Sequence, residues 1–349
     1  MSTVPSRQTR KTRIVCISDT HNQTPKLPQG DVLIHAGDMT KQGSRHELEK
    51  TVRWLESADF EAKIVIAGNH DMTLDAPFFE KQQSMGDRRK WPETQYPEEN
   101  RKLFTQSKSL TYLENEAATI YLNAKDGPRT CFKVYGSPCS PNNRNWAFGY
   151  RPGTAQKLWD AIPSDADFVV THTPPLGHCD RATHDERTGC EALLHALHRV
   201  RPMLSVFGHI HEARGVERVR WNLDSPENGC LTESVEVWED PGTGKKQSMV
   251  NLSAKGRRPL HNGSGLTRQT RNPELFTQSQ SSESPGLRGV LQPFDIKGLG
   301  SSEVGLRQPD VEAGERGETV MINAAFLGPH HLKTTFNKPI VVDVDLPVW

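Results

Sequence analysis

Five short apolar segments of this sequence each end in aspartate, asparagine or histidine, the side chains that bind divalent cations. The segments "CISDTH", "HAGD", "IAGNHD", "VVTHTPP" and "VFGHIH" supply Asp19, His21, Asp38, Asn69, His70, Asp71, His172, His209 and His211. Imidazole and carboxylate together suit Mn, Fe, Zn and similar ions. In open α/β sheets, ligand sites form outside the carboxyl ends of the strands, so these groups can converge. Their order and number predict one metal site.

Asp38 is the residue that most needs a cation. Residues 32–36 indicate a strand entering a core, and a lone ionised carboxylate at its end is costly unless a positive charge meets it. The neighbouring basic side chain, Lys41, lies past a turn. Because Asp38 has two carboxylate oxygens, it could bridge two cations, and we expect its partner to be metal.

Each segment could also have a purely structural role. Gly37-Asp38 and residues 68–71 could be ordinary turns, and His172 alone could be a core or loop histidine. Residues 208–211, Gly-His-Ile-His, are the stronger signal, because two histidines flanking an isoleucine at a strand exit have little structural reason. One shared metal site explains all five segments more simply than five unrelated turns or core residues.

The elements that position these side chains follow from the hydrophobic pattern. Near-continuous apolar runs predict strands covered on both faces at 13–18, 31–36, 63–67, 132–136, 167–171 and 204–208. Helical patterns lie between them at 44–58 and 189–200, opened by the capping-box pairs Ser44/Glu47 and Thr188/Glu191. Strands alternating with helices predict an α/β layered fold.

Composition divides the chain into four parts. Residues 1–12 are expected to be a disordered basic tail, and 13–221 the main part of one domain. Residues 222–317 are rich in Ser, Gly, Pro, Arg, Gln and Glu, and predict a mostly disordered insertion with a strand fragment at 234–238. Residues 318–349 contain strand signals at 319–326 and 339–349, which would complete the same domain.

Whole-chain composition argues against some classes of protein. Balanced totals of 43 basic and 43 acidic side chains give no broad basic surface, so no nucleic acid polymer is expected as a partner. No apolar run approaches the roughly 20 residues of a membrane helix, so no membrane partner is expected. The six cysteines form no C-x-x-C pair, which predicts reduced thiols in the cytoplasm or the nucleus.

In this order the five motifs resemble the calcineurin-like metallophosphoesterases, or metallo-dependent phosphatases, whose pattern is D-x-H, G-D, G-N-H-D/E, a later His and G-H-x-H. The surroundings "IHAGDMTKQG", "THTPPLGH" and "FGHIHEARG" are most similar to the metallophosphoesterase-domain, 239-type subgroup, with Thr173 standing where that subgroup has Gly. The resemblance covers roughly residues 13–221 and 318–349. It implies a four-layer α/β/β/α sandwich and two divalent metal ions (Mn, Fe, Zn or Mg).

The resemblance also implies a role for each site residue. One metal would be held by Asp19, His21 and His211, the other by Asn69, His172 and His209, with Asp38 bridging. Such a pair would activate a hydroxide for in-line attack on phosphorus. His70 is expected to stabilise the transition state or protonate the leaving oxygen. Asp71 would either orient His70 or cap the turn.

Four further residues have two interpretations each. His35 could support a ligand or be a core histidine. Arg144, His178 and Asp180 could line the substrate end of the site or belong to solvated loops.

The expected function is hydrolysis of a small phosphodiester, such as a cyclic nucleotide, or of a phosphomonoester. A phosphoprotein phosphatase is less favoured, because residues 39–43 read Met-Thr-Lys-Gln-Gly and lack the arginine of a Val-Asp-Arg-Gly segment. A catalytically weak scaffold that binds metal or nucleotide is the other alternative. The 222–317 insertion could recruit protein partners.

Overall fold

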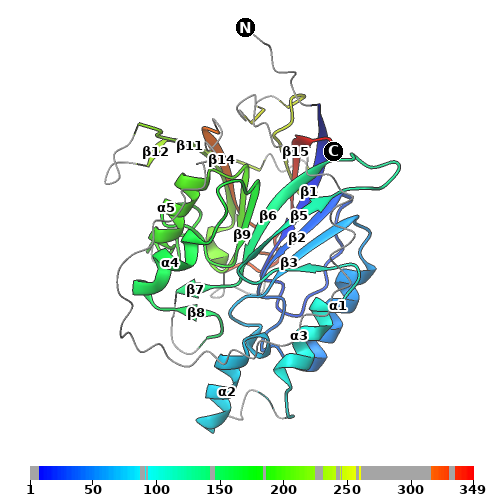
Figure 1. The fold of residues 1–349 in the computed structure, drawn as a ribbon, viewed down its shortest axis with the longest axis vertical. Coiled ribbons are helices and arrows are strands. Elements are labelled where there is room, and N and C mark those ends of the chain that lie inside the picture. The colour runs from blue at the N-terminus through cyan, green and yellow to red at the C-terminus, as the bar shows by residue number, and fades with distance from the viewer. Residues whose placement is uncertain are drawn as a thin grey trace, which may run out of the picture.

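Two β-sheets lie at the centre of the molecule (Figure 1). The computed structural model describes residues 8–86, 91, 93–141, 146–183, 186–224, 231–240, 244, 246–256, 259–260, 316–329 and 335–349. The first sheet has the order β13 (Ser248–Asn251), β15 (Ile340–Pro347), β1 (Thr9–Ile17), β2 (Val32–Ala36), β3 (Ala62–Ile66) and β4 (Thr111–Tyr112). Strands β1 to β4 are parallel, whereas β15 runs antiparallel to β1.

The second sheet also has a parallel centre. Its order is β12 (Thr232–Trp238), β11 (Gly215–Trp221), β14 (Glu318–Asn323), β10 (Leu204–Phe207), β9 (Phe168–Thr171), β6 (Cys131–Ser137) and β5 (Glu116–Tyr121). Strands β14, β10, β9 and β6 are parallel, and the outer strands are antiparallel. A separate short pair joins β7 (Ser140–Pro141) to β8 (Gly149–Tyr150).

Helices cover the outer face of each sheet. Figure 1 shows α1 (Arg45–Ser57) and α3 (Pro97–Thr105) beside the first sheet, and α4 (Ala155–Asp160) and α5 (Glu191–Val200) beside the second. Helix α2 (Ala76–Ser84) lies below them, and the short 3-10 turns are η1 (Met72–Leu74), η2 (Pro152–Thr154) and η4 (His211–Ala213).

Three buried clusters hold these layers together, as the period-2 alternation of a strand requires. In β1, Ile14 and Cys16 pack between the sheets, whereas Val15 and Ile17 pack under the helices of the first sheet. In β9, Val169 faces the helices of the second sheet. Three cores separate four layers, so the predicted α/β/β/α sandwich is confirmed.

The predicted strands and the first helix agree with the structure to within a few residues. Helix α1 begins after Ser44, whose side chain accepts a hydrogen bond from the Glu47 backbone N–H in a complete capping box. The second predicted box is wrong, because α5 begins at Glu191 after Cys190 with no side-chain cap. The Thr188 hydroxyl donates instead to the Asp180 carbonyl, which holds it in the preceding loop.

Ordered strands extend further than the predicted boundaries. Strand β1 begins at Thr9, inside the expected tail. The expected fragment at 234–238 lies in β12, and β13 within the expected insertion was not predicted. Residues 261–315 lie outside the described residues. In the described part of the chain, no helix is long and apolar enough to cross a membrane.

The carboxyl ends of β1 and β14 join the two sheets at one end of the molecule. The backbone N–H of Ser18 donates to Ala324, and the N–H of Phe326 donates back to Ser18. This junction places the segment after β14 next to Asp19.

Candidate metal centre

The candidate ligands lie at the ends of five strands that meet at this junction. They follow β1, β2 and β3 in the first sheet, and β9 and β10 in the second. Four of them have backbones in the left-handed region: Asp19 (φ 53°), His21 (φ 41°), Asp38 (φ 52°) and His209 (φ 69°). Such a conformation costs of order 1–3 kcal/mol for a non-glycine residue, and clusters where function requires it.

Asp19, His21 and His211 form the first group. The Asp19 Oδ1 atom lies 3.2 Å from His211 Nε2, and His21 Nε2 lies 3.3 Å from the same nitrogen. One ligand atom from each residue lies within 4.8 Å of the others, and all three side chains are buried. Two imidazole nitrogens and a carboxylate oxygen therefore point into one small space.

Asp38, His172 and His209 form the second group, with Asn69 beside it. The His172 Nε2 atom lies 3.4 Å from Asp38 Oδ2 and 3.0 Å from Asn69 Oδ1. The His209 ring packs against His172 with centroids 4.9 Å apart. The second group thus contains two imidazoles, an amide oxygen and a carboxylate.

Asp38 joins the two groups through a single oxygen. Its Oδ2 atom lies 3.7 Å from His21 Nε2 in the first group and 3.4 Å from His172 Nε2 in the second. The other oxygen, Oδ1, accepts a 2.7 Å hydrogen bond from the His70 backbone N–H, which fixes the carboxylate. This geometry is what a bridging carboxylate requires.

Backbone carbonyls fix three of the imidazole rings. His21 Nδ1 faces Thr40 O at 3.1 Å, His172 Nδ1 faces Ala36 O at 2.9 Å, and His211 Nδ1 faces Gly328 O at 3.4 Å. A carbonyl only accepts, so each Nδ1 must donate, and in the neutral ring Nε2 then presents its lone pair to the site. Metal-binding histidines are oriented in this way.

The electrostatics of the site favour positive charge at its centre. Burial lowers the pKa of His21 and of His209 to about 4, so both rings are neutral at pH 7 and able to ligate. Burial also lowers the pKa of His172, but the adjacent Asp38 carboxylate outweighs it and raises the pKa to about 9. A divalent cation would supply the charge that this carboxylate attracts.

Gly68 and Gly208 precede candidate ligands at positions where neighbouring atoms leave no room for a side chain. A Cβ at Gly68 would collide with the Asp38 backbone and carboxylate, and one at Gly208 would collide with Asp19 and Ser18. No other residue type fits at these two positions without moving a candidate ligand.

His70 lies at the exposed side of the cluster and is only half-buried. Its Nδ1 faces Lys41 O at 2.9 Å, and its ring packs on Trp146 with centroids 4.2 Å apart. The ring edge also contacts His21 at 4.7 Å between centroids. These contacts leave Nε2 as the ring atom able to meet a substrate.

Asp71 holds the turn rather than the His70 ring. Its oxygens accept hydrogen bonds from the backbone N–H groups of Met39, Thr40 and Gly68, and from the Thr40 hydroxyl. Burial, with the Asp38 charge, raises its pKa to about 6. These bonds support the turn-capping interpretation of Asp71.

The other sequence candidates lie outside the cluster or outside the described residues. His35 is fully buried under α1 and contacts the Thr20 hydroxyl at 3.0 Å, which fits a core histidine. His178 Nδ1 lies 2.8 Å from Glu217 Oε2. Asp180 accepts from the N–H groups of Gly177 and Gly189, which ties its loop together. Arg144 lies outside the described residues.

Two further residues support the centre, although sequence analysis gave neither of them a role. Trp146 packs on His70, and it lies in the segment "WAF", within the part of the chain that the family resemblance covers. Asn323 donates from Nδ2 to the carbonyls of Ile210 and Cys179, which fixes the turn that carries His211. Asn323 could have been found from the sequence, because it is a polar residue at the end of an apolar strand, as the candidate ligands are.

These residues fit two divalent cations. Imidazole, carboxylate and amide oxygen ligands match the borderline metals, and the donor atoms of each group lie close enough together to share a cation. Two Nε2 lone pairs 3.3 Å apart would repel each other without a cation or a proton between them.

Comparison with known proteins agrees with this geometry. The model of the calcineurin-like phosphoesterase family matches residues 12–213. Metallophosphoesterase domain-containing protein 1 of Homo sapiens is 40% identical over 210 residues, covering 59% of this chain and 62% of that protein. UPF0046 protein K07C11.7 of Caenorhabditis elegans is 36% identical over 214 residues, covering 61% and 68%.

A third relative is much longer than this chain. The probable rhamnogalacturonate lyase C of Emericella nidulans is 43% identical over 228 residues, which is 65% of this chain but 20% of that protein. The chain therefore spans between a fifth and about two thirds of the length of these three relatives. The family model covers more than half of the chain, and this chain belongs to the calcineurin-like phosphoesterase family.

Proposed function

We propose that this chain is a metal-dependent hydrolase of a small phosphodiester, such as a cyclic nucleotide, or of a small phosphomonoester. The observation that carries the proposal is the position of Asp38 Oδ2, within 3.7 Å of one ligand group and 3.4 Å of the other. That placement would let one carboxylate oxygen be shared by two cations, as the proposed two-metal mechanism needs.

Each side chain then has a task. Asp19, His21 and His211 would hold one cation, and Asn69, His172 and His209 the other, with Asp38 shared. Two such cations, when bound, polarise phosphoryl oxygens and activate water. His70, whose Nδ1–H donates to Lys41 O, would in its doubly protonated form carry a second proton on Nε2 and give that proton to the leaving oxygen.

The loop after β2 supports a small substrate rather than a phosphoprotein. Residues 39–43 contain no arginine, and the Thr40 hydroxyl makes its hydrogen bonds within the loop region. The Thr40 hydroxyl donates to Asp71 and accepts from the Gly43 N–H. Lys41 contributes its carbonyl to His70.

A metal analysis coupled to a substrate panel tests the proposal. Chain loaded with Mn, Fe, Zn or Mg would be assayed with bis-p-nitrophenyl phosphate, p-nitrophenyl phosphate, cyclic nucleotides and a phosphopeptide. We expect two ions per chain and turnover of the small esters. Two ions per chain without turnover of any ester would favour the scaffold alternative, and turnover of the phosphopeptide alone would favour the phosphatase alternative.

The remaining expectations stay proposals. The cysteine pattern favours the cytoplasm or the nucleus, balanced charge argues against a nucleic acid partner, and the lack of a long apolar run argues against a membrane partner. Protein partners for residues 222–317 are likewise a prediction from composition.

A further inference from the structure

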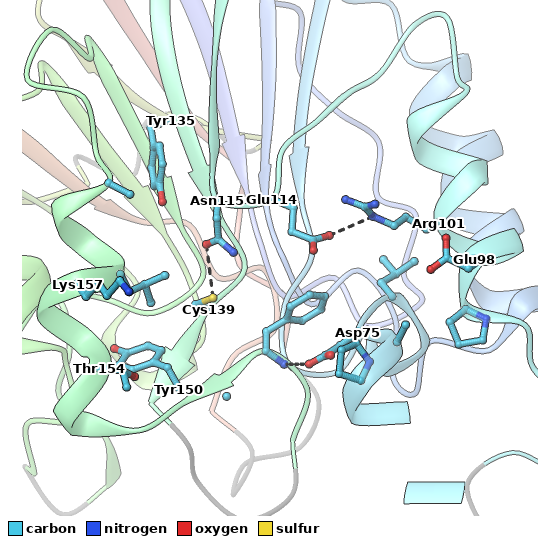
Figure 2. A pocket seen from close by; sticks show the side chains of 18 residues that line it. Asp75, Glu98, Arg101, Glu114, Asn115, Tyr135, Cys139, Tyr150, Thr154 and Lys157 are labelled. Atoms are coloured by element: carbon cyan, nitrogen blue, oxygen red, sulfur yellow. Dashed lines mark hydrogen bonds and ion pairs between the residues drawn. The ribbon is translucent and has the colours of Figure 1, made fainter. Parts of the chain in front are cut away.

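A pocket of about 690 Å³ lies between α4 on one side and α2 and α3 on the other (Figure 2). Its volume falls in the range of small-molecule sites. The walls include Leu74, Phe148, Tyr150 and Leu158, which give it a mainly apolar lining. None of the seven candidate metal ligands lines it, and neither does His70.

A buried hydroxyl in this pocket has no partner. Tyr135, on β6, is 1% exposed, and its hydroxyl makes no hydrogen bond with any described residue. Figure 2 shows the hydroxyl end of Tyr135 directed toward Cys139 within the pocket. An unpaired buried hydroxyl is costly to keep, and a ligand with a hydrogen-bond acceptor would relieve it.

The charged groups of the pocket are separated by side. Figure 2 shows Lys157 and Tyr135 on the α4 side, and Glu98 and Arg101 on the α3 side. Arg101 pairs with Glu114 at 3.3 Å. In the described part of the chain, the exposed Lys157 makes no ion pair, so a cation and an unpaired hydroxyl occur together at the α4 side.

The carboxylate of Asp75, which also lines the pocket, already accepts two hydrogen bonds. Its two oxygens accept from the backbone N–H groups of Phe78 and Phe148, at 3.1 and 2.6 Å. It therefore fixes the wall of the pocket that contains Phe148.

One wall connects the pocket to the metal centre without being part of it. Phe148 lines the pocket with its backbone in the left-handed region (φ 55°). The adjacent Ala147 donates its N–H to the carbonyl of Asn69 at 3.3 Å. The pocket and the ligand Asn69 thus lie on the two sides of one segment.

We propose that this pocket is a second binding site, distinct from the metal centre, for a small aromatic carboxylate. Its carboxylate would accept from the Tyr135 hydroxyl and pair with Lys157, and its ring would pack on Phe148 and Leu158. The proposal does not depend on the proposed hydrolysis.

Isothermal titration with 2-naphthoate as the probe tests the site, using the full chain after EDTA treatment. We expect saturable binding at one equivalent. Tyr135→Phe should raise Kd about tenfold, equivalent to about 1.4 kcal/mol, and Lys157→Met should do likewise. Lys125→Met, a matched change of an exposed lysine outside the pocket, should leave Kd unchanged. The neutral 2-naphthalenemethanol should bind the wild type more weakly than 2-naphthoate does.

Thermal unfolding gives an independent readout. Because Tyr135→Phe removes an unpaired buried hydroxyl, it should raise Tm without ligand by roughly 2–4 °C. A fall in Tm would show that the hydroxyl has a structural partner, and would overturn the proposal.

Two further measurements locate the bound probe. Mass spectrometry after iodoacetamide treatment should show Cys139 protected by 2-naphthoate, because Cys139 lines the pocket. Binding should persist in Asp38→Asn. Loss of binding in Asp38→Asn, unprotected Cys139, absence of saturable binding below about 1 mM, or unchanged Kd in both pocket variants would each overturn the proposal.

Discussion

Asp38 combines three unusual properties in one residue. It is 2% exposed, its backbone is left-handed (φ 52°), and its Oδ2 atom faces imidazoles from both ligand groups. Burial opposes ionisation, yet His172 and His70 lower the pKa of Asp38 well below its usual range. The neighbouring imidazoles therefore keep the Asp38 carboxylate ionised, as a ligand of a cation must be.

Replacing Asp38 by Asn should remove bound metal. An amide cannot supply a shared anionic oxygen, so metal content should fall from two ions to fewer than one per chain, measured by inductively coupled plasma mass spectrometry. Asp31→Asn is the matched control, because Asp31 accepts from the Arg13 backbone N–H away from the site. Retention of two ions in Asp38→Asn would contradict the bridging role.

Replacing His70 by Ala should separate catalysis from metal binding. One His70 ring nitrogen lies within 4.8 Å of ligand atoms of His21 and Asp38, but each proposed ligand group is complete without His70, so metal content should stay at two ions per chain. Turnover of bis-p-nitrophenyl phosphate should fall about 10²–10⁴-fold, as for a lost general acid. His195→Ala, on the exposed face of α5, serves as the control. Wild-type turnover in metal-loaded His70→Ala would refute the role.

At the scale of elements, parallel strands bring the site together. The carboxyl ends of β1, β2 and β3 and those of β9 and β10 point to the same end of the two sheets. The chain turns sharply there, which explains why Gly37, with a positive φ of 94°, precedes Asp38.

Gly208→Ala tests the closeness of β10 to Asp19. The added methyl group would collide with the Asp19 carboxylate, so metal affinity at the Asp19–His21–His211 group should fall by at least roughly tenfold, as when a ligand's support is changed. Gly153→Ala is the matched control, since a Cβ there meets nothing within 4 Å. Titration with Mn would measure both variants, and equal affinities would show that the strand end tolerates the methyl group.

At the scale of the molecule, the C-terminal strand β15 lies inside the first sheet, between β13 and β1. Strand β15 pairs antiparallel with β1, and Arg13 donates to both oxygens of Asp343 at 2.7 and 2.9 Å. Burial raises the pKa of Asp343, but the Arg13 hydrogen bonds outweigh it, and the pKa lies below its ordinary value.

This pair predicts a pH-dependent stability. Because the folded-state pKa is depressed, its stabilisation is complete above the unfolded pKa of about 3.9 and is lost as pH falls through the folded value. Asp343→Asn should cost about 2 kcal/mol at pH 7, and its Tm should approach that of the wild type below pH of about 4. Asp126→Asn, the same change at an exposed aspartate, is the control. A Tm difference that is constant with pH would contradict the role.

Local sequence determined much of the secondary structure of this protein. Continuous apolar runs predicted the strands that carry the site, and the Ser44/Glu47 pair predicted the start of α1, because hydrophobic periodicity and capping act over a few residues. Exposed or edge elements such as β5 and β13 were missed, since their residues are weakly patterned.

Tertiary structure alone decided the relations between distant residues. The sequence placed Asp71 beside His70, but only the fold showed its oxygens on Thr40 and Gly68. Likewise, only the fold brought Asp38 between His21 and His172, and left the Tyr135 hydroxyl unpaired. Residue types fix which chemistry is available, whereas side-chain distances depend on how strands far apart in sequence cross and pack.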